Sequence, residues 1–394
     1  MALFGSKINY LRERKADEEA RVDFSELFFD LVFVFAITQI SHYLLHHLSL
    51  DGLVNTVILL LAVWFAWVYT IWATNWFDPH RGPVRLLLFE LMLAGLFLST
   101  SLPEAFGERA FVFAIAYVVT QVGRSLFMIW ATRHHDPANF RSFQRIGAWF
   151  AFSGIFWLVG SAMEELAWQR ALWVAALAIE FVAPWFGYRV PGLGVSTTKD
   201  WQIDGHHMAE RSGLFVIIAL GESILIAGAT FTEMAWSAPV AVAFIAAFVI
   251  SVAMWWIYFN IGAEHSRERI AHSDDPGRIA RIAYSYVHAL IVAGIIVVAV
   301  GVELMLAHPV GHHAGLPVIL TLAGGACAYV IGNGLFKALS FGRWPLSHYV
   351  GIACLALVGF AARYFDPLAL GIAVSAVLVL VAAWEFLSLR SLRN

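Results

Sequence analysis

The most distinctive stretch of the chain is "VDFSELFFDLVFVFAITQISHYLLHH", residues 22–47, and near its start it carries two acidic residues one helical turn apart. Glu26 and Asp30 are four positions apart, so a helix would place both on one face, where like charges repel. A nearby cation, a bound metal ion or protonation of one acid would relieve this repulsion. Glu26 falls in the first turn, where an acid also complements the helix dipole, so we expect it to serve the helix start or an entrance. Asp30 lies a turn deeper among apolar residues, and we predict a functional role for it.

Other charged residues also fall inside apolar runs. A charge at the bilayer centre costs at least ~2.5–3.5 kcal/mol, so it is expected to face protein or water and to serve a purpose. Glu222, in "ALGESILIAG", is predicted to be a proton or cation site, or else one half of a buried ion pair. Arg124 is the one clear cation within a run, and we expect it to balance Glu222, Glu90 or Asp30, or to form a structural salt bridge. Ahead of the Glu222 run stand Glu210 and Arg211, which could form an entrance, and the remaining groups inside apolar runs are Glu180, His288 and Glu303.

The 15 histidines include two short clusters that are candidates for metal binding. His42 and His46 are an i, i+4 pair, which on a helix can share a metal ion. His206 and His207 stand in "DWQIDGHHMAER", where the nearby acids would suit pH sensing or a metal site. Exposed histidine clusters are commonly incidental, so a solvated loop is the alternative in both places. We expect no cofactor and no resident metal, with these four histidines as the only metal candidates.

The composition defines the elements that must position these groups. The chain has 394 residues, of which 60% are hydrophobic and 13% charged, whereas soluble domains are about one quarter charged. Apolar runs of about 20 residues recur throughout, which predicts an all-α, polytopic membrane protein. The net charge of −3 gives no reason to expect a nucleic-acid partner. The sequence contains no Walker loop, no G-x-S-x-G and no H-E-x-x-H, so we expect no enzyme of those classes.

The apolar runs predict about twelve membrane-spanning helices. All but four of the 25 lysines and arginines fall on one side of that arrangement. Because basic residues favour the inside, the N- and C-termini are expected to be cytoplasmic and the protein to lie in the bacterial inner membrane. The exceptions are Arg109, Arg170 and Arg363 in outside loops and Arg124 within a span. The expected spans are 27–44, 53–76, 84–101, 110–131, 146–163, 170–187, 213–232, 237–262, 279–305, 317–339, 346–363 and 367–388.

Matching segments predict two parallel six-helix repeats. "ELFFDLVFVFAITQI" from Glu26 lies over "ERSGLFVIIALGESI" from Glu210, and "IWATNWFDPH" resembles "WIYFNIGAEH". "AYVVTQVGRSLF" similarly resembles "AYVIGNGLF", and the two sixth helices carry Trp185 and Trp384. Such halves typically pack around an axis normal to the membrane, with a pathway between them. The expected division is a cytoplasmic tail 1–22, a first repeat 23–190, a cytoplasmic linker 191–212 and a second repeat 213–394.

These motifs carry a family resemblance. "ELFFDLVFVFAITQISH", "AERSGLFVIIALGESIL", "WWIYFN" and "YVHALIVAGI" together resemble the bacterial low temperature requirement A family over nearly the whole chain. The resemblance implies a polytopic inner-membrane protein associated by name with growth in the cold. It highlights Glu26, Asp30, Gln39, Glu210, Arg211, Gly221 and Glu222.

A second, partial resemblance concerns the first helix alone. "FFDLVFVFAIT" is similar to the F-S-D-x-V-F-x-x-A-I-T signature of potassium channels built from two six-helix repeats, but Phe29 replaces the Ser and the second half lacks the Asp. The leading hypothesis is therefore a transporter or channel for a proton, an ion or a small molecule. A membrane sensor or scaffold with structural ion pairs and a membrane-embedded enzyme acting on a lipid are the alternatives. The lipid bilayer is the expected partner, and a homodimer is one open possibility.

Overall fold

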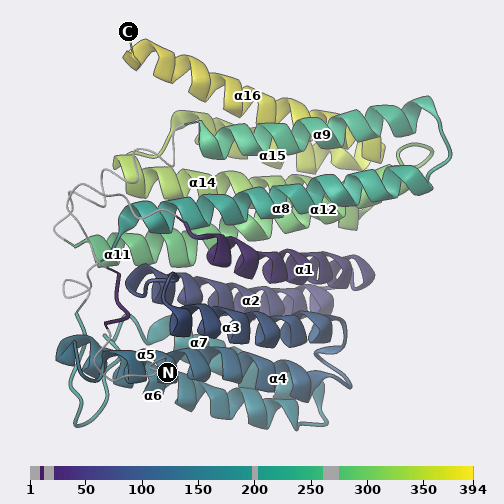
Figure 1. Cartoon of the computed structure of the whole chain (residues 1–394). Coiled ribbons are helices and arrows are strands. Elements are labelled where there is room, and N and C mark those ends of the chain that lie inside the picture. The colour runs from purple at the N-terminus through teal and green to yellow at the C-terminus, as the bar shows by residue number, and fades with distance from the viewer. Residues whose placement is uncertain (1–8, 13–21, 198–202, 261–274, 394) are drawn as a thin grey trace. The chain divides into compact units, whose positions relative to one another are not determined.

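The computed structural model describes residues 9–12, 22–197, 203–260 and 275–393. The tail 1–22 and the linker 191–212 that the sequence predicts therefore lie partly outside the described residues. The described residues form helices joined by short turns and contain no strand, only isolated backbone bridges at Leu11–Phe77 and Val190–Gly194. The chain divides into two compact units, and Figure 1 shows their helices coloured in chain order.

Unit 1 comprises Met1–Tyr43, Ser49–Met208 and Asp274–Arg278. Its fourth helical segment is interrupted by a π-helical turn, Val119–Gly123, between α4 and α5. Its core is aromatic, with Trp64, Trp67, Trp157 and Trp173 almost completely buried. Its helices are α1 (Phe24–His46), α2 (Leu50–Trp76), α3 (Gly82–Ser101), α4 (Ala110–Val118), α5 (Arg124–Thr132), α6 (Pro137–Ser161) and α7 (Leu166–Val182).

Unit 2 comprises Leu44–Leu48, Ala209–Ser273 and Ile279–Asn394, so the boundary between the units falls in the first turns of α8. π-helical turns precede α12 and α14, at Arg281–Val287 and Leu320–Gly324. The helices are α8 (Gly205–Glu233), α9 (Ala238–Phe259), α11 (Pro276–Ala280), α12 (His288–Ala307), α13 (Leu316–Ile319), α14 (Gly325–Phe341), α15 (Leu346–Ala361) and α16 (Pro367–Arg393).

Local sequence explains where several helices begin and end. Ser49 caps α2 by accepting a hydrogen bond from the Gly52 N–H, and Asp136 caps α6 by accepting one from Asn139. α6 also begins with Pro137, whose missing N–H would have no partner in the first turn. α14 ends at Gly342, whose φ of 74° is a left-handed conformation that glycine adopts without strain.

Glycine also allows α12 and α14 to approach closely. A Cβ atom on Gly294 would lie 2.6 Å from the backbone nitrogen of Tyr329, so any side chain there would force the helices apart. Gly332 faces Ile291 in the same way. Small residues at helix contacts are the usual means of close packing in membranes, where apolar area gives little driving force.

Ten helical segments of the described chain are long and apolar enough to cross a membrane. They coincide with ten of the expected spans. α6 and α7 occupy the ranges expected for the fifth and sixth spans but are not among the ten. α7 has 17 residues, and α6 begins with the polar stretch "PANFRSFQR".

Lys337, one of the basic residues assigned to the cytoplasmic side, lies four residues before the end of α14 and is buried.

Candidate functional site

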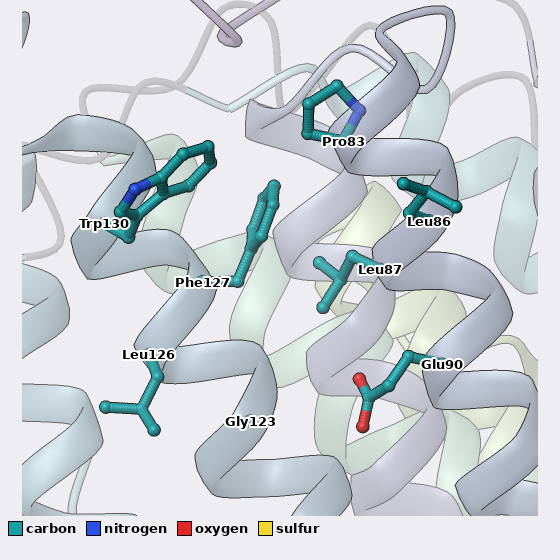
Figure 2. Close-up of a pocket in the computed structure, with 8 residues that line it drawn as sticks. All are labelled: Pro83, Leu86, Leu87, Glu90, Gly123, Leu126, Phe127 and Trp130. Atoms are coloured by element: carbon teal, nitrogen blue, oxygen red, sulfur yellow. The ribbon is translucent and has the colours of Figure 1, made fainter. Parts of the chain in front are cut away.

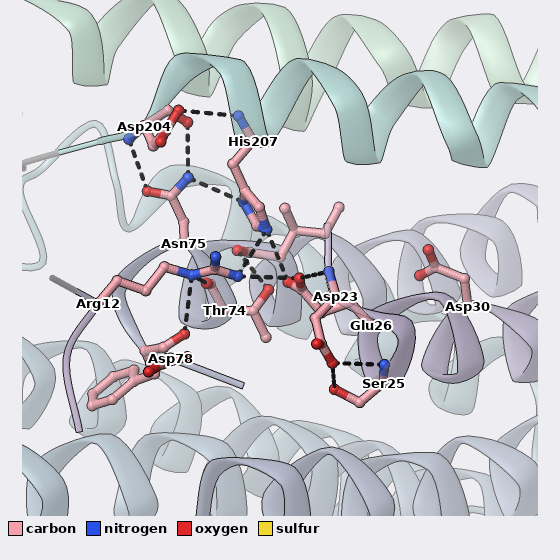
Figure 3. A network of polar contacts seen from close by, with 12 residues as sticks. Arg12, Asp23, Ser25, Glu26, Asp30, Thr74, Asn75, Asp78, Asp204 and His207 are labelled. Carbon is pink, nitrogen blue, oxygen red and sulfur yellow. Dashed lines mark hydrogen bonds and ion pairs between the residues drawn. The ribbon is translucent and has the colours of Figure 1, made fainter. Parts of the chain in front are cut away.

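The start of α1 holds a fully buried carboxylate, that of Glu26, in a network of polar contacts (Figure 3). Glu26 Oε2 accepts a hydrogen bond from the Asp23 backbone N–H at 2.9 Å, and Asp23 precedes the first helical residue. Asp-x-x-Glu in this position is a capping box, in which the third helical residue reaches back to the cap. The sequence prediction that Glu26 serves the helix start therefore agrees with its geometry.

A cation reaches Glu26 from outside the helices. Arg12 Nη2 is 3.1 Å from Glu26 Oε2, and Arg12 Nε donates to the Thr74 carbonyl at 2.7 Å. The Arg12 backbone N–H also bonds the Trp76 carbonyl at 2.8 Å, and the Tyr10 ring stacks on Trp130. Segment 9–12 is thus fastened to the end of α2, which places the guanidinium beside the buried acid.

His207, near the start of α8 and also within unit 1, supplies a third donor. Its Nε2 lies 2.9 Å from Glu26 Oε1, and both side chains are 0% exposed. Its Nδ1 lies 3.3 Å from Asn75 Nδ2. Arg12 Nη2 is 3.3 Å from His207 Nε2, so three ionisable side chains meet in one buried place.

Asn75 determines which ring nitrogen of His207 carries the proton. The Asp204 backbone N–H donates to Asn75 Oδ1 at 3.0 Å, and Asn75 Nδ2 donates to the Asp204 carbonyl at 2.8 Å. This pair of bonds fixes the amide with its N–H₂ toward the ring, so His207 Nδ1 must accept. In the neutral ring the proton is then on Nε2, directed at Glu26. Asp204 also accepts from the His207 backbone N–H, which caps α8.

Asp30, the residue for which the sequence predicts a function, is 1% exposed on α1. Its Oδ1 accepts a hydrogen bond of 2.8 Å from Trp67 Nε1 on α2. It stands one turn beyond Glu26, as Figure 3 shows, so two buried carboxylates follow one another along α1. Gln39 is nine residues beyond Asp30, which places it on the opposite side of an α-helix with 3.6 residues per turn.

Arg124 is buried in unit 1 but makes no ion pair with Asp30 or Glu90, within the described residues. It donates to Gln121, to Thr70 Oγ1 at 3.2 Å and to the Ala66 carbonyl at 3.4 Å. Its guanidinium also lies 5.7 Å from the Tyr69 ring centre. The charge is therefore accommodated by amide, hydroxyl, carbonyl and aromatic groups.

Gln121 connects Arg124 to the buried acid Glu180 on α7. Gln121 Nε2 lies 2.8 Å from the Tyr117 hydroxyl, and that hydroxyl donates to Glu180 Oε2. Glu180 Oε1 accepts from Ser153 at 2.8 Å and from Trp157 at 3.1 Å. A hydrogen-bonded chain across helices α2, α4, α5, α6 and α7 therefore stabilises the interior of unit 1.

Unit 2 contains a direct buried ion pair that the sequence prediction missed. Lys337 Nζ on α14 lies 2.6 Å from Glu385 Oε2 on α16 and donates to the Ile257 carbonyl on α9 at 2.7 Å. His348 Nδ1 on α15 is 3.3 Å from Glu385 Oε1. The sequence did contain a signal for Glu385. The sixth helix of each unit carries a similar tetrapeptide, "AIEF" with Glu180 and "AWEF" with Glu385.

The other predicted site residues are distributed over both units. In unit 2, Glu222 and Arg211 on α8 are 5% and 0% exposed, and Glu210 is half-buried. Glu90 on α3 is exposed, as are His42 and His46 on α1. The described residues contain no cluster of three or more His, Cys, Asp and Glu side chains that could hold a metal ion. Both ring nitrogens of His207 contact protein groups. Among the four metal candidates, His207 is therefore the one whose contacts indicate a role other than metal binding.

An all-helical chain with ten segments able to cross a bilayer and with ionic groups paired in its interior is a polytopic membrane protein. Residues 21–383 match the family model described as bacterial low temperature requirement A protein, so the chain belongs to that family. It is 39% identical over 393 residues to an uncharacterized protein of Rhizobium meliloti (strain 1021), covering 98% of this chain and 94% of that one. No solved structure matches the chain.

Proposed function

We propose that the protein is a transporter or channel of the bacterial inner membrane that moves protons or a proton-coupled substrate past the buried cluster of Glu26, His207 and Arg12. The observation that carries the proposal is the 2.9 Å contact between a fully buried carboxylate and a fully buried imidazole. Glu26 is the member of this contact that can take up and release a proton, and the Nε2 N–H of His207 stabilises its ionised form.

Each residue has a part in this proposal. His207 donates its Nε2 N–H as a hydrogen bond to the ionised Glu26 and keeps that proton, and Arg12 keeps a positive charge beside the acid when the transported proton leaves Glu26. Asp30 is the next carboxylate along α1, about 6 Å on by the usual spacing of one turn, and would accept the proton through a water or by a small side-chain movement. Glu222, with Glu210 and Arg211 at the start of α8, would act in the second unit.

We further propose the twelve-span arrangement with two parallel repeats and cytoplasmic termini. The two units pair their helices in the same order: second with sixth, third with fourth, fourth with fifth and fifth with sixth. In both, the fourth helix carries a buried cation that donates to a second-helix carbonyl, Ala66 for Arg124 and Ile257 for Lys337. In both, the sixth carries a buried Glu. Two unrelated six-helix units would have no reason to share the helix pairing, the buried cation and the buried Glu. These shared features therefore support a duplicated six-helix half and the proposed arrangement.

Flux in proteoliposomes tests the proposal. The purified chain is reconstituted with a pH-sensitive dye inside, and proton movement is followed under potassium, sodium and organic-acid gradients. Glu26→Gln and Asp30→Asn should each lose the flux, whereas Glu164→Gln, an exposed acid in the turn between α6 and α7, should keep it. Folded variants of Glu26 and Asp30 that transport like the parent would refute the assignment.

A structural scaffold is the second candidate, and one observation favours it. The Lys337–Glu385 pair and the Glu180 chain have hydrogen-bond partners on several helices, as expected of groups that hold helices together. We therefore assign both clusters to stability and not to transport. Arg124, which is linked to the Glu180 chain, has the same assignment. Under a purely scaffolding function, Asp30→Asn would lower thermal stability and no gradient would drive flux in the parent.

A further inference from the structure

A groove of about 600 Å³ lies between α3 and α5 of unit 1, and it contains a single charged residue (Figure 2). Its lining is otherwise apolar and includes Leu87 on α3 and the rings of Phe127 and Trp130 on α5. Leu86 and Leu126 are more than half exposed at its rim. Ligand pockets in proteins are typically of this size, mostly apolar and equipped with few polar groups.

The charged residue is Glu90, and its carboxylate projects into the groove. It is eight residues into α3, about 12 Å along the helix from Gly82, so it lies well inside the span. Among the described residues it has no hydrogen bond and no ion pair. Arg124 attracts this carboxylate electrostatically, but its guanidinium is itself bound by Gln121 and Thr70. An acid at this depth that makes no direct contact with a cation has room for one from outside the protein.

The opposite wall leaves room in front of that acid. Gly123 faces Glu90, and a Cβ atom there would already lie 3.6 Å from Glu90 Oε1, so a longer side chain would occupy the space before the carboxylate. Gly123 also ends the π-helical turn Val119–Gly123, and π-turns of this kind are frequent at functional sites. The glycine and the distorted turn together form the hollow beside the acid.

We propose that this groove binds a lipophilic organic cation, that is, an amine, ammonium or phosphonium group carrying a bulky apolar body. The cation would lie against the Glu90 carboxylate in place of a protein partner. The apolar body would fill the space between Leu87 and Leu126 and pack against the rings of Phe127 and Trp130. The groove opens through apolar rim residues, so such a molecule would enter from the bilayer. This site is independent of the Glu26 cluster and does not require the proposed transport function.

Equilibrium binding of radiolabelled tetraphenylphosphonium to the purified full chain in detergent tests the proposal. We expect saturable binding that weakens about tenfold or more in Glu90→Gln, because a charge-assisted contact is lost. Gly123→Leu should also weaken binding by filling the hollow, which provides a second variant with the charge intact. Glu164→Gln is the matched control and should bind like the parent, and all variants are compared by gel filtration and thermal stability.

Tetraphenylborate has nearly the same shape and the opposite charge. Measured in a separate experiment without the phosphonium, it should not bind saturably to the parent chain. Saturable binding of tetraphenylborate that Gly123→Leu weakens, or unchanged phosphonium binding in Glu90→Gln, would show that the groove accepts apolar molecules without regard to charge, and would overturn the proposal. The absence of saturable phosphonium binding in the parent would overturn it equally. Loss of phosphonium binding in Glu90→Gln, with no tetraphenylborate binding to the parent, supports it.

Discussion

Removing the charge of Lys337 gives the sharpest test of the structure, because its ammonium group makes three short contacts with named protein atoms. Lys337 Nζ contacts both oxygens of Glu385, at 2.8 and 2.6 Å, and the Ile257 carbonyl at 2.7 Å. The Lys337 and Glu385 side chains are 4% and 7% exposed. Breaking a buried ion pair by removing one partner typically costs about 3–5 kcal/mol, since the other charge is left uncompensated. His348, at 3.3 Å from Glu385, offers a partial substitute, so we expect a loss of about 3 kcal/mol in Lys337→Met.

The double variant Lys337→Met with Glu385→Leu removes both charges and should recover most of that loss, since apolar residues can replace a buried pair at little cost. For a unit of this size each kcal/mol corresponds to roughly 2–4 °C in Tm, so the single variant should melt at least about 6 °C below the parent. Thermal unfolding in one detergent measures all variants together. Arg343→Met, at an exposed position just after α14, is the control and should change Tm little. Equal losses in the single and double variants would refute the pairing.

Three further predictions concern packing, topology and pH. Gly301→Ala should cost about 1–3 kcal/mol, because its Cβ would lie 2.8 Å from the Leu322 backbone nitrogen, whereas Gly228→Ala has open space and should be neutral or stabilising in the same melting assay. In a background lacking Cys327 and Cys354, His135→Cys and Glu164→Cys should react with an impermeant maleimide from opposite sides of the membrane, and labelling from one side would mean that α6 does not cross. Burial raises the pKa of Asp23, but hydrogen bonds from Ser25 together with the attraction of His80 lower it more, so the net pKa lies below its ordinary value. The stability that Ser25 contributes should therefore be present above pH ~4 and vanish as the pH falls below it, which Ser25→Ala melted across that range would reveal.

The sequence predicted the membrane-helical class and the helix positions well because both depend on local features. Apolar runs, Ser and Asp caps and Pro starts act within a few residues, so the expected span 84–101 and the observed α3, Gly82–Ser101, nearly coincide. The burial of Glu26 and Asp30 was also foreseeable, because an acid in an apolar run must be enclosed. These were inferences about single segments.

Partners could not be predicted in the same way, because they depend on how segments pack. His207 was considered for a metal, yet it meets Glu26, which is 181 positions away in the sequence. Arg124 was expected to pair with an acid directly, and it reaches Glu180 only through Gln121 and Tyr117. Lys337 stands near the end of an apolar run, and only the packing of α16 against α14 shows that its partner is Glu385.

The three buried clusters differ in a way that bears on function. Glu180 and Glu385 each lie on the last helix of a unit, and each carboxylate is bound by side chains from two other helices of the same unit, so moving either would separate packed helices. Glu26 is held differently: two of its donors, Arg12 and His207, come from segment 9–12 and from the first turn of α8, and neither lies in the middle of a helix. Short segments and helix ends can shift at a lower cost than a packed core. A proton or ion that alters the charge of Glu26 can therefore be linked to movement of these segments, whereas the same change at Glu180 or Glu385 would act against the stability of the whole unit.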